Sequence, residues 1–503
     1  MRNSSSIKSG AIISYISVFL TIGITFFYTP WMIDQIGVSD YGLYSLVNTL
    51  IAYFVMDFGL SGTVTRFIAK YRAEGKEQSI ENLMGLILKV YLAIDVVIFL
   101  VLLVIGFFLA GIFQGLTPEE IEKLRVLYAM GALFSVVTFV FKPMNGAMMA
   151  FEFFVETKLV DMVQKVGTVL LIVISLLLGM GVYALVFING AVALLSSITL
   201  YCLFKKKSGT NVNMRYFDKT EMKALFGFSI WVFLITMAQR FRLTFMPSLL
   251  GMMSNSIEIS IFSLGWSIEG MVYVLSSALN GLFLPKVTRL SFQGDSNAIT
   301  DLMIQVGRIQ FYIIALIYSG FLILGQQFIV LWVGDRFYNT YFIVLLLVGT
   351  NLVSLTQHIA SDLVYAENKV RYTSTISFLS SGLALIGAIL LAPRYGALGC
   401  AISYFLVMTL NLIQYNVFYK RSLKIDVLRF FKECHLKQAP LLTVLALISY
   451  IILKQVTISN WGTFALCGCI YGLLFIIISY LFLFNKEEKK IVKQIACKIK
   501  WKD

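Results

Sequence analysis

Charged residues are scarce in this chain. They make up 14% of its 503 residues, whereas hydrophobic residues make up 58% and the mean hydropathy is +0.83. A soluble globule of this size needs more polar surface than such a composition supplies. The sequence is therefore that of a protein embedded in a membrane.

The usual chemistry-bearing patterns are also missing. Two histidines, His358 and His435, are too few for a histidine metal cluster, and the six cysteines are scattered without metal-ligand or disulfide spacing. The sequence has no Gly-x-x-x-x-Gly-Lys-Ser/Thr loop for ATP, no Ser/His/Asp arrangement and no sizeable outer loop. We therefore expect no enzymatic activity, no cofactor and no metal.

The formal net charge of +14 invites a nucleic-acid interpretation. The basic residues, however, lie in short loops between apolar runs and in the tail, where insertion topology and anionic lipids account for them. No soluble segment is long enough to fold a nucleic-acid-binding module. We expect membrane lipids as partners, and no nucleic acid.

Long apolar runs recur along the whole sequence. A helix of about 20 apolar residues crosses the hydrocarbon core of a bilayer, and about fourteen such runs are present, which predicts an all-α, polytopic membrane protein. The predicted spans are 10–33, 41–66, 83–113, 124–150, 157–179, 182–204, 224–250, 257–284, 299–325, 340–366, 371–392, 396–419, 438–456 and 461–484.

The basic residues follow every second span. By our count about 29 of the 41 Lys and Arg fall in the connections after even-numbered spans and in the tail, and about five fall on the other side. Positive loops remain in the cytoplasm. We therefore predict that both termini are cytoplasmic.

Two pairs of segments indicate an internal repeat. Thr29-Pro30-Trp31 matches Met246-Pro247-Ser248, and the segment beginning at Gly181 matches the one beginning at Gly396. Both pairs give an offset of roughly 215 to 218 residues, which is six spans, as in transporters built from parallel repeats; chance similarity between apolar segments is the alternative. The predicted division is a first six-helix lobe at 1–208, a second at 209–422, two further helices at 423–485 and a basic amphipathic cytoplasmic tail at 486–503.

Charges inside the spans are the candidate functional residues. Each costs a few kcal/mol in lipid unless it faces a cavity or a partner, and two six-helix lobes enclose such a cavity near the midplane. The deepest charges form the predicted substrate-binding set: Asp57, Lys142, Arg240, Arg242 and Glu269. Structural ion pairs between helices, and a proline kink at Pro143 that serves packing alone, are the alternatives.

Three other basic residues lie closer to a predicted cytoplasmic helix end. Lys89, Lys165 and Arg308 are within a few turns of such an end. Their long side chains could extend to the lipid headgroups. For these residues we expect contact with the interface rather than a functional role.

The N-terminal segment carries a family resemblance. The stretch from Ser14 to Pro30, the Gly-x-x-x-Tyr-Gly-Leu-Tyr motif from Gly37 to Tyr44, and the segments Asp57 to Leu60 and Arg66 to Tyr71 resemble the signature of the polysaccharide transporter family, the Wzx-type oligosaccharide flippases. This family lies within the multidrug/oligosaccharidyl-lipid/polysaccharide exporter (MOP) superfamily. Beyond the first eighty residues the similarity is one of layout.

The resemblance implies an activity and partners. It implies a flippase that moves an undecaprenyl-diphosphate-linked oligosaccharide across the bacterial plasma membrane by alternating access, for O-antigen, capsule or exopolysaccharide assembly. The polymerase and the chain-length regulator of that pathway are the implied protein partners. Basic and acidic residues along the cavity would bind the substrate, a role that we give to the five deep charges by their depth alone.

Two other functions stay open at this point. A multidrug exporter of the same superfamily, coupled to protons or sodium, would favour acids and aromatics in its cavity. In these spans basic residues are at least as numerous as acids, which favours an anionic substrate modestly. A membrane scaffold that transports nothing would leave Arg240, Arg242 and Glu269 with packing as their only purpose.

We predict that Arg240→Ala or Arg242→Ala abolishes export of surface polysaccharide at an unchanged protein level. A guanidinium forms paired, charge-assisted hydrogen bonds with a diphosphate, and alanine cannot replace them. The measurement is surface polymer in cells complemented with each variant. Normal polymer in both variants would exclude the cavity assignment.

Overall fold

The computed structural model describes residues 23–54, 60–220, 222–223, 245–276, 283–367, 369–456, 458–486 and 488–490. Every regular element in these ranges is a helix. Ten of the described helices are long and apolar enough to cross a membrane. One of them, Arg371–Ser422, spans two predicted crossings, and four other predicted spans (10–33, 41–66, 224–250 and 257–284) extend outside the described residues. The prediction of an all-α, polytopic membrane protein is confirmed.

The chain forms two compact units. Unit 1 comprises Met1–Ser263 and Ser377–Cys400, and unit 2 comprises Leu264–Ile376 and Ala401–Asp503. The predicted boundaries at 208, 422 and 485 stay predictions. Two helices, α10 (Ser256–Ser276) and α16 (Val370–Ser422), pass from one unit to the other.

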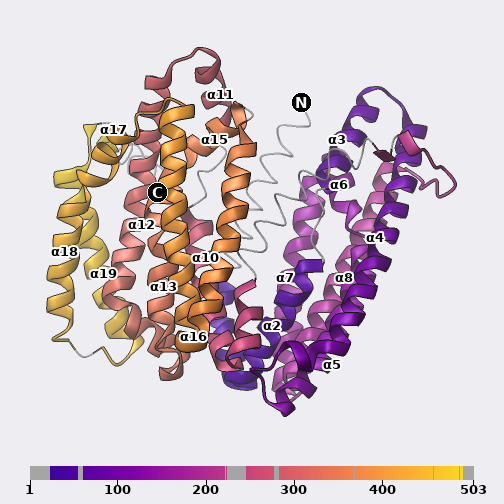
Figure 1. Ribbon diagram of the computed structural model, residues 1–503, viewed down its shortest axis with the longest axis horizontal. Helices are drawn as coiled ribbons and strands as arrows, with labels where there is room; N and C mark the ends of the chain where they lie inside the picture. The colour runs from indigo at the N-terminus through magenta and orange to yellow at the C-terminus, as the bar shows by residue number, and fades with distance from the viewer. Residues whose placement is uncertain are drawn as a thin grey trace, which may run out of the picture. The chain divides into compact units, whose positions relative to one another are not determined.

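Unit 1 is a bundle of long helices. Within it α3 packs against α6, and α8 packs against both α5 and α7 (Figure 1). Residues 23–36 are also helical. The labelled helices that lie wholly in this unit are α2 (Val38–Phe54), α3 (Leu60–Ala73), α4 (Glu77–Ile112), α5 (Pro118–Phe139), α6 (Pro143–Ala150), α7 (Phe154–Leu177) and α8 (Gly181–Ser208).

Local sequence explains where α5 begins and ends. Thr117 and Glu120 form a reciprocal capping box, and Pro118 occupies the first turn, where a missing N–H costs nothing. The helix ends at Phe139, and α6 restarts at Pro143. Because proline has no N–H to offer the Phe139 carbonyl, the Lys142 N–H binds that carbonyl instead, at 3.0 Å. The break expected at Pro143 is therefore present.

Unit 2 is built around α12. This helix begins at an Asp295 cap and packs against α13, α15, α18 and α19 (Figure 1). The labelled elements that lie wholly in unit 2 are α11 (Leu284–Phe292), α12 (Ser296–Val333), η2 (Asp335–Phe337), α13 (Thr340–Gly349), α14 (Asn351–Ser354), η3 (Leu355–Gln357), α15 (His358–Ala366), α17 (Val427–Phe431), η4 (Lys432–Leu436), α18 (Ala439–Leu453), α19 (Trp461–Ile478) and η5 (Ser479–Leu483).

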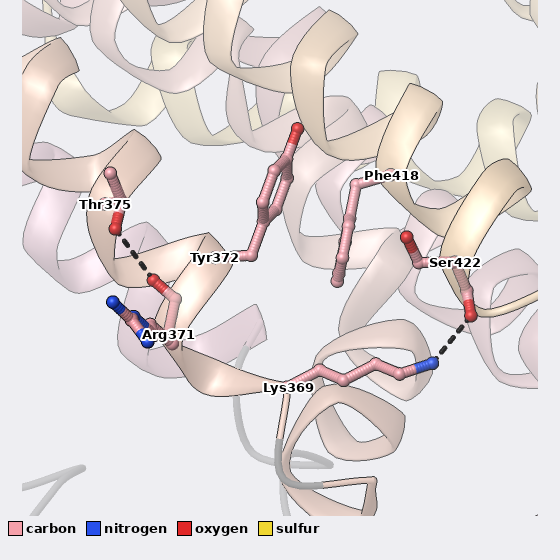
Figure 2. Close-up of a pocket in the computed structure, with 6 residues that line it drawn as sticks. All are labelled: Lys369, Arg371, Tyr372, Thr375, Phe418 and Ser422. Atoms are coloured by element: carbon pink, nitrogen blue, oxygen red, sulfur yellow. Dashed lines mark hydrogen bonds between the residues drawn. The ribbon is translucent and has the colours of Figure 1, made fainter.

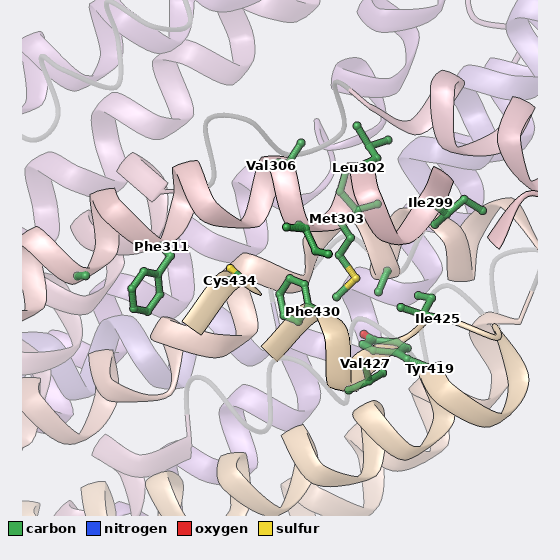
Figure 3. Close-up of a cluster of buried hydrophobic side chains, with 14 of the residues drawn as sticks. Ile299, Leu302, Met303, Val306, Phe311, Tyr419, Ile425, Val427, Phe430 and Cys434 are labelled. Carbon is green, nitrogen blue, oxygen red and sulfur yellow. The ribbon is translucent and has the colours of Figure 1, made fainter. Parts of the chain in front are cut away.

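One apolar cluster holds unit 2 together. Met303 on α12, Phe430 on α17 and Cys434 on η4 are fully buried in it (Figure 3). A side chain at Gly307 would come within 2.8 Å of the Thr356 carbonyl oxygen. Glycine is therefore required where α12 passes η3.

Matched backbone features support the internal repeat. Gly181, the first residue of α8, has φ of +66° and Gly396 within α16 has φ of +54°, 215 residues apart. Gly75 before α4 and Gly294 before α12 both have φ of +70°, 219 residues apart. A left-handed backbone favours glycine. The offset found in the sequence thus recurs in local conformation.

Arg308 does not contact the interface in the way that we expected. Its side chain is 8% exposed and holds Glu488, just beyond η5, through Nε–Oε1 and Nη2–Oε2 distances of 2.6 and 2.8 Å. The guanidinium also donates to the carbonyls of Glu433 and Leu483. Arg308 is buried because it pairs with Glu488, which is 180 residues away in the sequence. This pair attaches the start of the tail to α12 of unit 2.

Lys89 also has a specific partner. Its Nζ donates to the Tyr216 carbonyl at 2.9 Å, in the connection after α8. The same connection is held by Glu81 and Asn82 of α4 through Asn213. Lys89 therefore fixes a loop within unit 1.

We predict that Arg308→Ala destabilises the protein by about 3–5 kcal/mol, because it leaves Glu488 buried without its cation. The matched control is Arg429→Ala, since Arg429 is 41% exposed and pairs with the exposed Asp301 and Glu433. Such an exposed pair contributes little to stability, because solvent screens it. Unfolding of both variants in detergent gives the comparison, and equal loss in the two would contradict the assignment.

Candidate functional site

Unit 1 contains a polar cavity among its apolar helices. Its volume is about 340 Å³, which is within the usual range of small-ligand sites. Ten of its eighteen lining residues are polar: Asn48, Ser135, Thr138, Lys142, Asn145, Asp161, Gln164, Asn189, Ser196 and Ser197. Polar groups at membrane depth normally face a cavity or each other. We call this set the polar pocket.

Five elements build the polar pocket. Asn48 comes from α2, Thr138 from the last turn of α5, Asn145 from α6, and Gln164 from α7. The α8 residues Asn189, Ser196 and Ser197 complete the lining. The break between α5 and α6 brings Lys142 to the wall, because it ends the regular helix there. The helix interruption thus serves the site as well as the packing.

One basic and one acidic side chain line the pocket. Lys142 and Asp161 both line it, and Asp161 Oδ2 is 3.7 Å from Lys158 Nζ on the same helix. The amide of Asn189 donates to the Tyr44 hydroxyl at 3.1 Å and to its own helix at Leu185. The buried hydroxyl of Thr138 has no hydrogen-bond partner among the described residues. Thr138 itself lines the pocket.

Aromatic side chains close the pocket on the other sides. Phe134 and Phe141 belong to its lining. A side chain at Gly190 would come within 2.3 Å of the Phe134 ring. Apolar ring faces beside amides and hydroxyls are the usual environment of a small polar ligand.

The five predicted site residues fall into three groups. Lys142 lines the polar pocket. Glu269 lies in unit 2, is 8% exposed and accepts a 2.8 Å hydrogen bond from the Asn351 amide. Asp57, Arg240 and Arg242 lie outside the described residues. Their role in binding stays a prediction.

Sequence reasoning did not select the amides of the pocket. It ranked residues by charge, and Asn48, Asn145, Gln164 and Asn189 carry none. The signal that could have found them is side-chain amides recurring deep within apolar spans. Asp161 was visible as a charge within a span but was not selected.

A second polar cluster in unit 1 joins residues far apart in the sequence. The hydroxyls of Ser39 and Ser256 both donate to Glu120 Oε1, the former at 2.6 Å, and their oxygens are 3.1 Å apart. The capping box orients Glu120, because its Oε2 accepts from the Thr117 N–H at 2.9 Å. Ser260 donates to the Val38 carbonyl at 2.6 Å. We call these residues the serine cluster.

The spacing in the serine cluster equals the repeat offset. Ser39 and Ser256 are 217 residues apart. In a parallel two-fold repeat, a residue touches its own counterpart only close to the axis. A side chain at Gly42 would come within 2.1 Å of the Ser256 carbonyl oxygen, so the chains meet there without side chains between them.

Comparison with known protein families identifies the family of this chain. Residues 7–290, more than half of the chain, match the model of a family described as polysaccharide biosynthesis protein. The chain belongs to this family. The prediction of a polysaccharide transporter family member is confirmed. A comparison with curated proteins gives no match.

Solved structures share the fold of this family member. A lipid II flippase, MurJ, in its inward closed conformation is 12% identical with a TM-score of 0.69, covering 94% of this chain and 98% of that one. An inward-facing multidrug resistance MATE transporter of the MOP superfamily is 13% identical with a TM-score of 0.62, covering 76% and 95%. The Vibrio cholerae MATE transporter VcmN is 15% identical with a TM-score of 0.54, covering 86% and 99%. These are transporter and flippase folds rather than enzyme folds.

We predict that Ser39→Cys and Ser256→Cys form a disulfide, in a background without the six native cysteines. The two hydroxyl oxygens are 3.1 Å apart, so the side chains face each other at the range in which cysteine sulfurs can bond. After mild oxidation, a thiol-reactive mass tag should label neither cysteine. Each single variant is the control and should be labelled after the same treatment; full labelling of the pair would contradict the contact.

Proposed function

We propose that this protein is a flippase that moves an undecaprenyl-diphosphate-linked oligosaccharide across the bacterial plasma membrane. The observation that carries the proposal is the polar pocket. Its amides and hydroxyls are the groups that hydrogen-bond sugar hydroxyls, and Lys142 offers a cation to a phosphate. The family description and the fold shared with a lipid II flippase support a lipid-linked substrate.

The lining of the pocket separates this proposal from a multidrug exporter. The fold alone does not, because MATE transporters share it. A pocket for organic cations would gather acids and aromatics, with few hydrogen-bonding amides. Here Lys142 offsets Asp161, and four amide side chains line the wall. A neutral, hydroxyl-rich ligand fits this lining better than an organic cation.

The mechanism that we propose is alternating access. The sugar and its diphosphate would enter the polar interior while the prenyl chain remains in lipid. The basic loops predict that both termini are cytoplasmic, and with that topology Ser39, at the start of α2, would lie on the outer side. The serine cluster would then be part of an outer closure, which hydroxyl hydrogen bonds to Glu120 hold.

The proposal includes a place in a pathway. The flipped oligosaccharide would be used for O-antigen, capsule or exopolysaccharide assembly. The enzymes that receive it on the outer side, a polymerase and its chain-length regulator, would be the protein partners.

We predict that Thr138→Val lowers the rate of oligosaccharide export about fivefold without lowering protein stability. Valine keeps the shape and removes a hydroxyl that has no partner in the described protein, so only a ligand loses a hydrogen bond of about 1 kcal/mol. Gln164→Leu should lower the rate as well, since it also removes a polar group of the wall. The measurement is the rate at which labelled polysaccharide appears at the cell surface.

Thr199→Val is the matched control. Thr199 is exposed on α8, and its hydroxyl donates a hydrogen bond to the Leu195 carbonyl of the same helix. It does not line the pocket. Its variant should export at the normal rate. If Thr138→Val and Thr199→Val behave alike, the pocket does not bind the substrate.

A further inference from the structure

Unit 2 has a depression at one end of α16 that the proposed transport does not use. Its volume is about 540 Å³, and it is lined by Lys369, Arg371, Tyr372, Thr375, Phe418 and Ser422. These residues come from the first two turns of α16, the residue before it, and its last two turns. Because α16 is bent at Gly396 and crosses the membrane twice, both groups lie at one membrane surface. We call this the basic depression.

Contacts between the two ends of α16 hold the depression in shape. The rings of Tyr372 and Phe418 stack with centroids 4.4 Å apart, and the Tyr415 hydroxyl donates to the Thr373 carbonyl at 3.2 Å. Lys369 Nζ donates to the Ser422 carbonyl at 2.7 Å (Figure 2). Figure 2 shows Lys369 extended toward Ser422 and the two rings face to face. The depression is therefore a built feature of the helix pair.

The charges of the depression differ in their availability. Lys369 Nζ is 2.7 Å from Glu367 Oε2, so its charge is neutralised locally. The side chain of Arg371 is exposed and forms no ion pair with the described residues. Lys420, Arg421 and Lys424 are exposed nearby in the sequence. This surface is thus strongly positive. Because the charge of Arg371 is not neutralised by an ion pair with a described residue, Arg371 is the residue of the depression that suggests an anionic ligand.

The surroundings indicate the kind of ligand. Tyr372 is 48% exposed beside a basic group, the combination found where protein meets lipid headgroups. Val417 and Ile413, one and two turns deeper in the membrane, are 44% and 57% exposed and offer an apolar surface to an acyl chain. Basic residues at the cytoplasmic end of spans attract anionic headgroups. A phosphate beside Arg371 with a chain along Val417 satisfies both requirements.

We propose that the basic depression binds the headgroup of an anionic phospholipid of the inner leaflet. Arg371 contacts the phosphate, and the Tyr372–Phe418 stack forms the wall beside the glycerol. The bound lipid would bridge the two ends of α16 and steady unit 2. This site is separate from the polar pocket, which lies in unit 1, and it does not depend on the proposed substrate.

The test compares Arg371→Gln with Arg421→Gln in the full-length protein. Arg421 is exposed at the same end of α16 but does not line the depression, so each variant removes one charge from the same surface. Binding of dioleoylphosphatidylglycerol is measured by native mass spectrometry, with dioleoylphosphatidylcholine and inorganic phosphate as the other probes. Arg371→Lys, which keeps the charge, is the third variant.

We expect Arg371→Gln to weaken phosphatidylglycerol binding about fivefold, the effect of one basic residue near an anionic headgroup. Arg421→Gln should weaken it less than twofold, and Arg371→Lys should retain most of it. Equal losses in the two Gln variants would show diffuse attraction and overturn the site. Equal binding of phosphatidylcholine, or full competition by inorganic phosphate, would overturn the assignment to an anionic lipid.

Discussion

Hydrocarbon offers no hydrogen bonds, so a chain that crosses a membrane must satisfy its own backbone polar groups. All the described regular elements are helices for that reason, and departures from regular helix need a local cause. The break at Pro143 borders the polar pocket. At the bend at Gly396, the Ala397 N–H donates a 2.6 Å hydrogen bond to Glu258 Oε2. Irregular backbone in this protein thus occurs where side chains or a cavity take over its hydrogen bonds.

The internal repeat explains why distant residues meet. Glycines with a left-handed backbone recur at offsets of 215 and 219 residues, and the serine cluster joins Ser39 to Ser256 at an offset of 217. The predicted duplication accounts for the contact between Ser39 and Ser256 as one between corresponding residues. Hydroxyl hydrogen bonds to Glu120 and the close approach of the backbone at Gly42 both hold this contact together.

The sequence predicted the fold well because hydropathy and loop charge are properties of short segments. Lys142 was predictable as a charge beside a proline within a span, and it does line the pocket. The neutral amides Asn48 and Gln164 were not, because only charged residues within the spans were considered. The prediction for Arg308 was wrong because its partner, Glu488, is remote in sequence and only folding brings the two together.

The most direct test is a transport assay with the purified protein in vesicles. A prenyl-diphosphate-linked oligosaccharide with a fluorescent sugar is placed in both leaflets, and an impermeant quencher reports the fraction that crosses. The account predicts crossing far faster than in protein-free vesicles, slowed about fivefold by Thr138→Val and unchanged by Thr199→Val. Crossing no faster than in protein-free vesicles, with the same protein exporting an organic cation, would contradict it.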